Sequence, residues 1–264
     1  MVRGTRDAYA STALRNEAHK RFKMAERLEA EYMRSLRMLA KQIDHIVKGM
    51  APAGVVTDSH ELQRVLRQYG IAIRPWATSV ASKMVNRIAG VDESRWYSLS
   101  KQMGTALKKE LQNAPTGKWL RQYLEENVEL ITSLPEDAAR RVHDLTFGAL
   151  STGRRAEEIQ KDILRTGDVT LSRARLIART EVARTASGLV QSRMTNVGLT
   201  HYVWRTSMDE TVRESHREMN GKIIEWAENN GKGHLLSDGT VCHAGQIWNC
   251  RCYPEPVLPD LSND

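Results

Sequence analysis

The sequence predicts a mainly α-helical protein with a small C-terminal α+β domain. Aromatic residues make up only 6% of the 264 residues, while Ala, Leu, Arg and Glu are frequent, a composition that favours helices. No Gly or Pro interrupts the chain between Thr12 and Gly49, and a stretch rich in β-favouring residues, "THYVWRTS", comes late. We therefore expect a long amphipathic helix over residues 1–50, a helical domain over 51–167 and a compact α+β domain over 168–264.

The first helix is predicted from its apolar spacing. The apolar residues alternate in steps of four and three, which places one stripe against a partner: Tyr32, Leu36, Leu39, Ile43, Ile46 and Met50. The opposite face is rich in Lys and Arg. Two interpretations of this face stay open, a solvated surface and a contact with DNA.

The middle of the chain reads as a series of shorter helices. "MAPAGVVTDSHE" ends the first helix, and Asp58 or Ser59 can cap the next, over 61–69. We expect further helices from Pro75, over 92–113 and over 118–134. Pro135 would end the last of these and start another, and "RRAEEIQKDILRTG" would form a short helix that stops at Gly167.

The α+β domain begins with one more helix. We expect it to be capped near Thr170 or Ser172 and to end at Gly198, and five arginines against one glutamate lie between Leu171 and Arg193. "THYVWRTS" then predicts a strand, "DETVRESHREMNG" a helix that stops at Gly221, and "KIIEW" a second strand. "AENNGKGHLLSDGT" reads as a loop, and "QIWNCRCYPEPVL" as a closing strand.

Charge and cysteine content narrow the class of protein. The net charge of +7 and a pI of about 9.4 favour polyanionic partners, nucleic acid first. Three cysteines argue against a secreted disulfide framework. The sequence shows neither a signal-peptide pattern nor an apolar run long enough to span a bilayer, so we expect synthesis in a cytoplasm and no membrane anchor.

Residues with metal-ligand chemistry gather near the C-terminus. They include all three cysteines: His216, His234, Cys242, His243, Cys250 and Cys252. Such clustering in a cytoplasmic protein suggests tetrahedral zinc. We predict His216, His243, Cys250 and Cys252 as its ligands, with Cys242 as an alternative. Two other interpretations stay open: the cysteines fill the core, or Cys242 bridges another cysteine on oxidation.

Several motifs occur in a fixed order along the last third of the chain. They are an Ala-Arg-Thr-Glu helix with Arg179 and Glu181, a strand and turn with Trp204 and Asp209, and a helix with Arg213, His216 and Gly221. His243-Ala244-Gly245 and Asn249-Cys250-Arg251-Cys252 follow. This combination, over about residues 127–258, resembles the phage head morphogenesis family, the minor capsid proteins related to protein F of phage Mu.

The resemblance implies a structural component of a virion. It implies a protein made in the host bacterial cytoplasm and located in the head interior or portal region. Its partners would be the portal protein and the inner capsid, with double-stranded DNA as a further partner, and its role head assembly, DNA packaging or genome delivery.

Two departures from the family pattern concern the metal. Ala244 stands where the family usually has proline. Arg213 stands where some relatives carry the first cysteine of a Cys-x-x-Cys pair, to whose second cysteine His216 corresponds. The missing cysteine weakens a complete metal site or shifts its fourth ligand to His243 or Cys242.

The other motif residues are expected to form a structural network. Glu181 and Arg184 are three residues apart and can pair on one helix face. The Asn249 amide and the Arg251 guanidinium can fix a turn or reach a phosphate. We therefore expect no catalytic residue.

The alternative is a zinc-dependent nuclease or hydrolase that uses His216 and the cysteine cluster. In that enzyme Glu181 or Asp209 would act as the base.

Overall fold

The long first helix forms as predicted from Thr12 onward, and residues 1–11 of the predicted span lie outside the described residues. In this computed structural model, which describes residues 12–100, 116–152 and 155–257, helix α1 runs over Thr12–Met50. Four members of the predicted stripe are buried, Tyr32, Leu36, Leu39 and Ile43, and the other two pack against the same core. The steps of four and three thus mark the face that the helix buries.

Helices α2 (Ser59–Ala72) and α3 (Arg74–Ser100) follow a short 3-10 turn, Pro52–Gly54. Asp58 caps α2 as predicted, because its carboxylate accepts the backbone N–H groups of His60 and Glu61 at 3.0 and 2.9 Å. The predicted helix boundary near Asp92 is wrong. Asp92 lies inside α3, where its carboxylate accepts hydrogen bonds from Trp96 and Arg193, and residues 101–113 of that predicted helix lie outside the described residues.

Helix α5 (Thr116–Thr152) contains Pro135, so the predicted break there is also wrong. Proline removes one backbone hydrogen bond but does not by itself end a helix whose two sides are held by packing. Here α2 packs on this part of α5. A Cβ on Gly70 would lie 3.2 Å from the Thr132 carbonyl oxygen and 3.9 Å from the Pro135 ring, so the two helices approach closely beside the proline.

Helices α6 (Ala156–Leu164) and α7 (Thr166–Asn196) are separated by a single residue. Gly167 therefore lies in the first turn of α7 and is not a stop, and α7 begins before the predicted caps Thr170 and Ser172. A side chain at Gly167 would overlap Asp44 of α1, so this glycine lets the two helices meet. The predicted end at Gly198 agrees with its positive φ of 75°.

The C-terminal unit is built on a three-stranded antiparallel sheet in the order β2-β1-β5. Strand β1 (His201–Arg205) is central, and it pairs with β2 (Ile223–Glu225) and β5 (Tyr253–Pro256). Tyr202 and Trp204 of β1 are completely buried. Gly221, at a φ of 85°, turns the chain back so that its N–H donates to the Trp204 carbonyl at 2.8 Å.

Short elements complete this unit. They are α8 (Glu214–Arg217), α9 (Glu228–Gly231) and the pair β3 (His234–Leu235) and β4 (Val241–Cys242). The segment predicted as a loop therefore holds α9 and β3. The closing strand is shorter than predicted, and Cys250 and Cys252 precede it in a turn.

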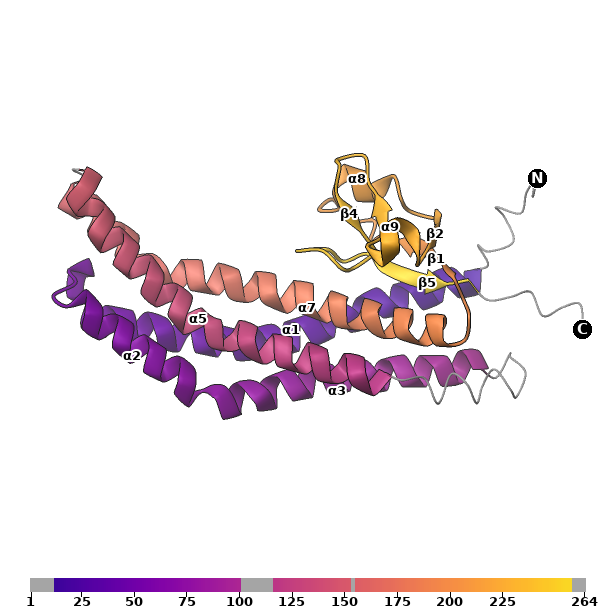
Figure 1. Ribbon diagram of the computed structural model, residues 1–264, viewed down its shortest axis with the longest axis horizontal. Coiled ribbons are helices and arrows are strands. Elements are labelled where there is room, and N and C mark those ends of the chain that lie inside the picture. The colour runs from indigo at the N-terminus through magenta and orange to yellow at the C-terminus, as the bar shows by residue number, and fades with distance from the viewer. Residues whose placement is uncertain (1–11, 101–115, 153–154, 258–264) are drawn as a thin grey trace, which may run out of the picture.

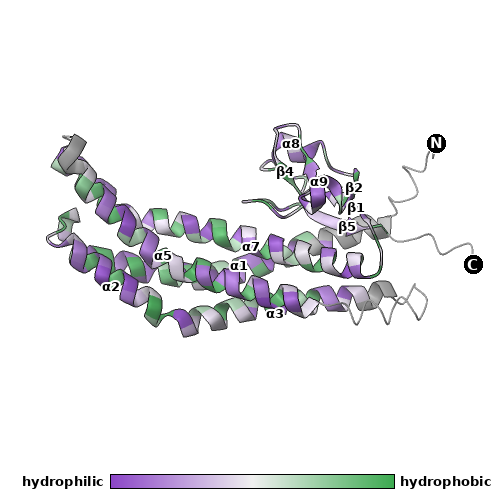
Figure 2. Cartoon of the chain, viewed as in Figure 1, coloured by the Kyte–Doolittle hydropathy of each residue, from purple (hydrophilic) through white to green (hydrophobic). Residues whose placement is uncertain are grey.

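Figure 1 shows an elongated bundle of helices with the small unit on one side, beside the C-terminal half of α7. Helix α7 packs against α1, α3 and α5 and also contacts β5. One hydrophobic core fills the bundle, and a second lies between α7, Trp96 of α3 and the sheet. Hydrophobic and hydrophilic residues alternate along the bundle helices in Figure 2, as expected for amphipathic helices around a core. The predicted fold class, mainly α with a small α+β unit, is confirmed.

Among the described residues, the helices include none that is both long and apolar enough to cross a membrane.

Candidate functional site

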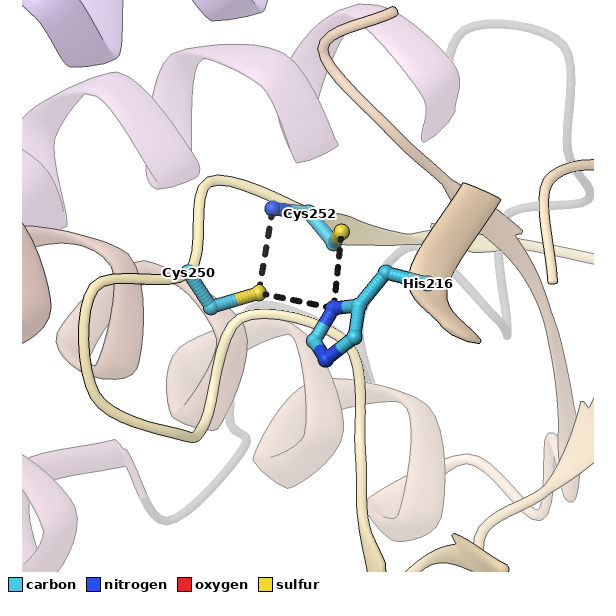
Figure 3. A group of neighbouring side chains, drawn as sticks. All are labelled: His216, Cys250 and Cys252. Carbon is cyan, nitrogen blue, oxygen red and sulfur yellow. Dashed lines mark hydrogen bonds between the residues drawn. The ribbon is translucent and has the colours of Figure 1, made fainter. Parts of the chain in front are cut away.

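Three of the predicted ligand residues come together in the C-terminal unit. His216 lies on α8, and Cys250 and Cys252 lie in the turn that leads into β5 (Figure 3). The imidazole Nδ1 of His216 is 3.5 Å from the Cys250 Sγ and 3.4 Å from the Cys252 Sγ. One ligand atom from each residue lies within 4.8 Å of the others, and all three side chains are buried. We call these three residues the His/Cys triad.

The local structure fixes each member of the triad. The Trp204 indole and the His216 ring pack in a T-shaped arrangement, with ring centroids 5.4 Å apart and an angle of 82° between the planes. The Cys252 backbone N–H donates to the Cys250 sulfur at 3.4 Å. Asn249, just before the triad turn, has a φ of 60°, which a short polar side chain tolerates. The triad is therefore held in place by the fold.

The two triad sulfurs differ in acidity. The side-chain hydrogen bond between them lowers the pKa of Cys250 well below its ordinary value and raises that of Cys252. Burial adds to the rise at Cys252, and the His216 imidazole adds to the fall at Cys250. The pair thus favours a state in which Cys250 is a thiolate, the form that binds metals.

The remaining predicted ligands are not part of the triad. His243 is completely buried, its Nδ1 is 3.1 Å from the Tyr202 hydroxyl, and its ring packs against the Tyr202 and Trp226 rings. Burial lowers its pKa. Cys242 is buried in β4, where burial raises the pKa of its thiol to about 12. All three cysteines carry free thiols.

The motif residues on α7 link the bundle to the triad turn. Arg179 donates to the Glu29 carboxylate of α1 at 3.2 Å and to the Asn249 side-chain oxygen at 2.9 Å. The Asn249 backbone N–H donates to the Thr180 hydroxyl at 3.0 Å. Arg251 lies 3.5 Å from the same Glu29 carboxylate and 3.7 Å from Asp209. One carboxylate of α1 thus serves two arginines of the C-terminal half.

Glu181 occupies the interior of the bundle. It is completely buried, and its carboxylate accepts hydrogen bonds from Arg184 at 3.1 Å and from Asn127 at 3.4 Å. Burial raises the pKa of Glu181, and Arg184 opposes that rise. Asn127 in turn accepts a hydrogen bond from Tyr32 at 2.9 Å. The predicted pair of Glu181 and Arg184 is present, as one part of a wider polar network.

Asp209 shapes the turn before α8. Its carboxylate accepts the backbone N–H and the hydroxyl of Thr211 at 2.9 and 2.6 Å, and the hydroxyl bond is the main cause that lowers its pKa. Neither Asp209 nor Glu181 belongs to the group of side chains that could share one metal ion. Both carboxylates are instead engaged in bonds that hold the fold.

Sequence reasoning missed several partners because they are distant in the chain. Glu29 lies 150 residues before Arg179, and Asn127 lies 54 residues before Glu181. Ser187 was also missed, although its hydroxyl fixes the loop before the triad by donating to the Ala244 carbonyl at 2.7 Å. The one sequence feature that could have indicated this role is that Ser187 is a polar residue on the buried face of α7.

Ala244 has a role that proline could not fill. Its backbone N–H donates to the Tyr202 hydroxyl at 3.3 Å, and proline lacks that N–H. This hydrogen bond ties the loop to the sheet.

A curated protein is similar to most of this chain. A curated protein of Haemophilus influenzae (strain Rd), described as an uncharacterized protein, is 28% identical over 254 residues, which are 89% of this chain and 54% of the relative. The chain thus spans about half the length of the curated relative it matches. No solved structure matches.

A family model described as "Phage Mu protein F like protein" matches residues 140–254. The matched segment begins within α5, contains α7, the triad, β1 and β2, and ends within β5. Residues 140–254 are therefore a phage Mu protein F-like segment, which confirms the family resemblance that the motifs indicated.

Proposed function

We propose that this chain is a minor head protein of a tailed phage or prophage. In this proposal it associates with the portal protein and the inner capsid and aids head assembly, DNA packaging or genome delivery. The match of residues 140–254 to the family of phage Mu protein F carries the coarser part, a role in phage head morphogenesis. The proposal assigns no catalytic residue.

The bonding of the motif residues supports an architectural role. Arg179, Asn249 and Arg251 connect the triad turn to α7 and to Glu29 of α1. Arg179 and Asn249 hydrogen-bond to each other, and both arginines lie beside the Glu29 carboxylate. The motifs that mark the family thus hold the C-terminal unit on the bundle.

Disruption of the gene in its phage or prophage tests this proposal. We expect lysates that contain tails but few DNA-filled heads when examined by electron microscopy, and filled heads restored by a plasmid copy. Normal numbers of DNA-filled, infectious particles from the disrupted strain would reject a role in head morphogenesis.

We further propose that α1 binds DNA through its exposed basic face. Five basic side chains of α1 are exposed and lie on one side of the helix: Lys23, Arg27, Arg34, Arg37 and Lys41. We call these five residues the α1 basic stripe. It covers about 27 Å at 1.5 Å per residue, enough to follow several phosphates of one duplex.

The charges of the α1 basic stripe are available for phosphates. Within the part of the chain that the structure describes, none of the five forms an ion pair with a carboxylate. The stripe also lies opposite the apolar stripe that faces the core. Contacts of this kind recognise the phosphate backbone and carry little sequence preference.

Salt dependence tests the DNA proposal. A protein that neutralises phosphates with five cations has a log–log slope of affinity against salt of about −4.5, and each lost cation reduces it by about 0.9. We expect the triple variant Arg34→Gln, Arg37→Gln and Lys41→Gln to flatten the slope by about 3 in filter binding.

The matched control removes the same charge elsewhere. Arg67, Arg121 and Lys161 are exposed basic residues on other helices. If their replacement by Gln changes the slope as much as the stripe variant does, binding is spread over the whole surface and α1 is not the DNA site. Binding by wild type that is flat in salt would reject DNA contact altogether.

A further inference from the structure

We propose that the His/Cys triad binds one zinc ion through the Nδ1 atom of His216 and the two Sγ atoms of Cys250 and Cys252. The fourth position faces an adjacent small cavity and holds water. This inference is independent of the proposed role in the head, so either can fail alone.

The distances within the triad match those that zinc requires. Zinc bonds are about 2.3 Å to sulfur and about 2.0–2.1 Å to imidazole nitrogen, so a tetrahedral ion places its nitrogen and sulfur ligands about 3.6 Å apart. The two observed separations, 3.4 and 3.5 Å, are close to this value. The nitrogen–sulfur separations therefore already suit a tetrahedral ion, and all three ligand atoms lie within 4.8 Å of one another.

The chemistry of the donors selects the metal. Two thiolates and one imidazole are soft and borderline ligands, which favour zinc over magnesium or calcium. The side chains are 2%, 3% and 4% exposed for His216, Cys250 and Cys252, so the ion would be shielded from chelators in solution. Two thiolates also balance the double charge of the ion, which lowers the free-energy cost of burying it.

The ligand positions are set in advance. Trp204 packs against the His216 ring in a T-shaped arrangement, and the turn with Cys250 is tied to α7 through Asn249 and Thr180. Preorganised ligands lose little conformational entropy on binding, which favours high affinity.

The fourth ligand comes from solvent. Among the described residues, the triad is joined by no further His, Cys, Asp or Glu ligand atom within 4.8 Å of its members. A cavity of about 30 Å³ adjoins the triad and is lined also by Arg179, Arg213 and Arg251. That volume accepts about one or two waters.

Metal content of the full chain tests the assignment. Protein purified under reducing conditions without chelators should contain about one zinc per chain by elemental mass spectrometry. Cobalt added to the metal-free protein should give a thiolate-to-cobalt charge-transfer band that saturates at one equivalent. X-ray absorption at the zinc edge should show two sulfur and two nitrogen or oxygen neighbours.

Matched variants separate the triad from its surroundings. Cys250→Ser and Cys252→Ser should weaken cobalt affinity at least about tenfold. Cys242→Ser and His243→Gln, at buried residues of the same unit, should leave it unchanged. Where a triad variant loses its far-UV circular dichroism, the absorption spectrum of wild type decides the ligand set.

Absence of stoichiometric zinc together with absence of the cobalt band would overturn the proposal. Equal loss of metal in Cys242→Ser, or three or more sulfur neighbours in the absorption spectrum of wild type, would overturn the proposed ligand set.

Discussion

Gly245 offers the sharpest test of how the C-terminal loop is held. It is buried at a φ of 79°, and a Cβ there would lie only 2.6 Å from the Cys252 carbonyl oxygen and 3.4 Å from the Ala183 carbonyl oxygen. Both neighbours are backbone atoms, which cannot rotate away. Gly239 provides a matched control, because its φ is 83° but nothing lies within 4 Å of its Cβ position.

The two substitutions differ by one physical cost. An alanine in the left-handed region costs about 1–2 kcal/mol, which both variants share. Overpacking against fixed atoms adds about 1–3 kcal/mol at Gly245 alone. We therefore expect the free energy of unfolding to fall by about 1–2 kcal/mol in Gly239→Ala and by about 2–5 kcal/mol in Gly245→Ala.

Urea denaturation followed by tryptophan fluorescence measures both values. Three of the six tryptophans, Trp96, Trp204 and Trp226, belong to the core between α7 and the sheet, so the signal reports on this region. If Gly245→Ala and Gly239→Ala agree to within about 0.5 kcal/mol, the loop does not pack on Cys252 as described, since the shared backbone cost would then explain both.

Three further predictions concern stability and its pH dependence. Asp58→Ala should cost about 1 kcal/mol in urea denaturation, because two capping bonds of α2 are lost; no change would contradict the cap. Leu36→Ala, at a completely buried side chain, should cost about 2–5 kcal/mol, whereas Met38→Ala, 60% exposed, should change stability by less than about 0.5 kcal/mol; equal costs would contradict the α1 packing. Burial lowers the pKa of His243, so below about pH 6.5 the unfolded chain binds a proton that the folded chain does not. The free energy of unfolding should therefore fall from pH 7 to pH 5, and it should fall less steeply in His243→Gln than in wild type. Identical slopes for the two proteins would refute a buried, neutral His243.

Local features of the fold were predictable from the sequence. The apolar stripe of α1 and the cap at Asp58 depend on residues within one or two turns of one another, so their spacing is sufficient evidence. Pro135 and Gly167 were misread as helix ends. Both lie where a neighbouring helix holds the backbone, and that packing is not visible in the local sequence.

The candidate site, too, was predictable only in the features that depend on local sequence. The sequence indicated that Cys250, Cys252 and His216 share a unit, because Cys and His residues gather there. It did not separate His216 from His243, since only the tertiary fold places one beside the sulfurs and the other beside Tyr202. The role of Glu29 depends on the contact of α1 with α7, which joins residues 150 positions apart in the sequence. No local sequence pattern indicates such a contact.

Quantitative mass spectrometry of purified, DNA-filled particles tests the proposed function most directly. The account predicts peptides from this chain in heads that have been freed of host protein, at a few copies for each portal. Heads of normal composition that lack the chain, with the protein recovered only from the soluble lysate, would contradict it.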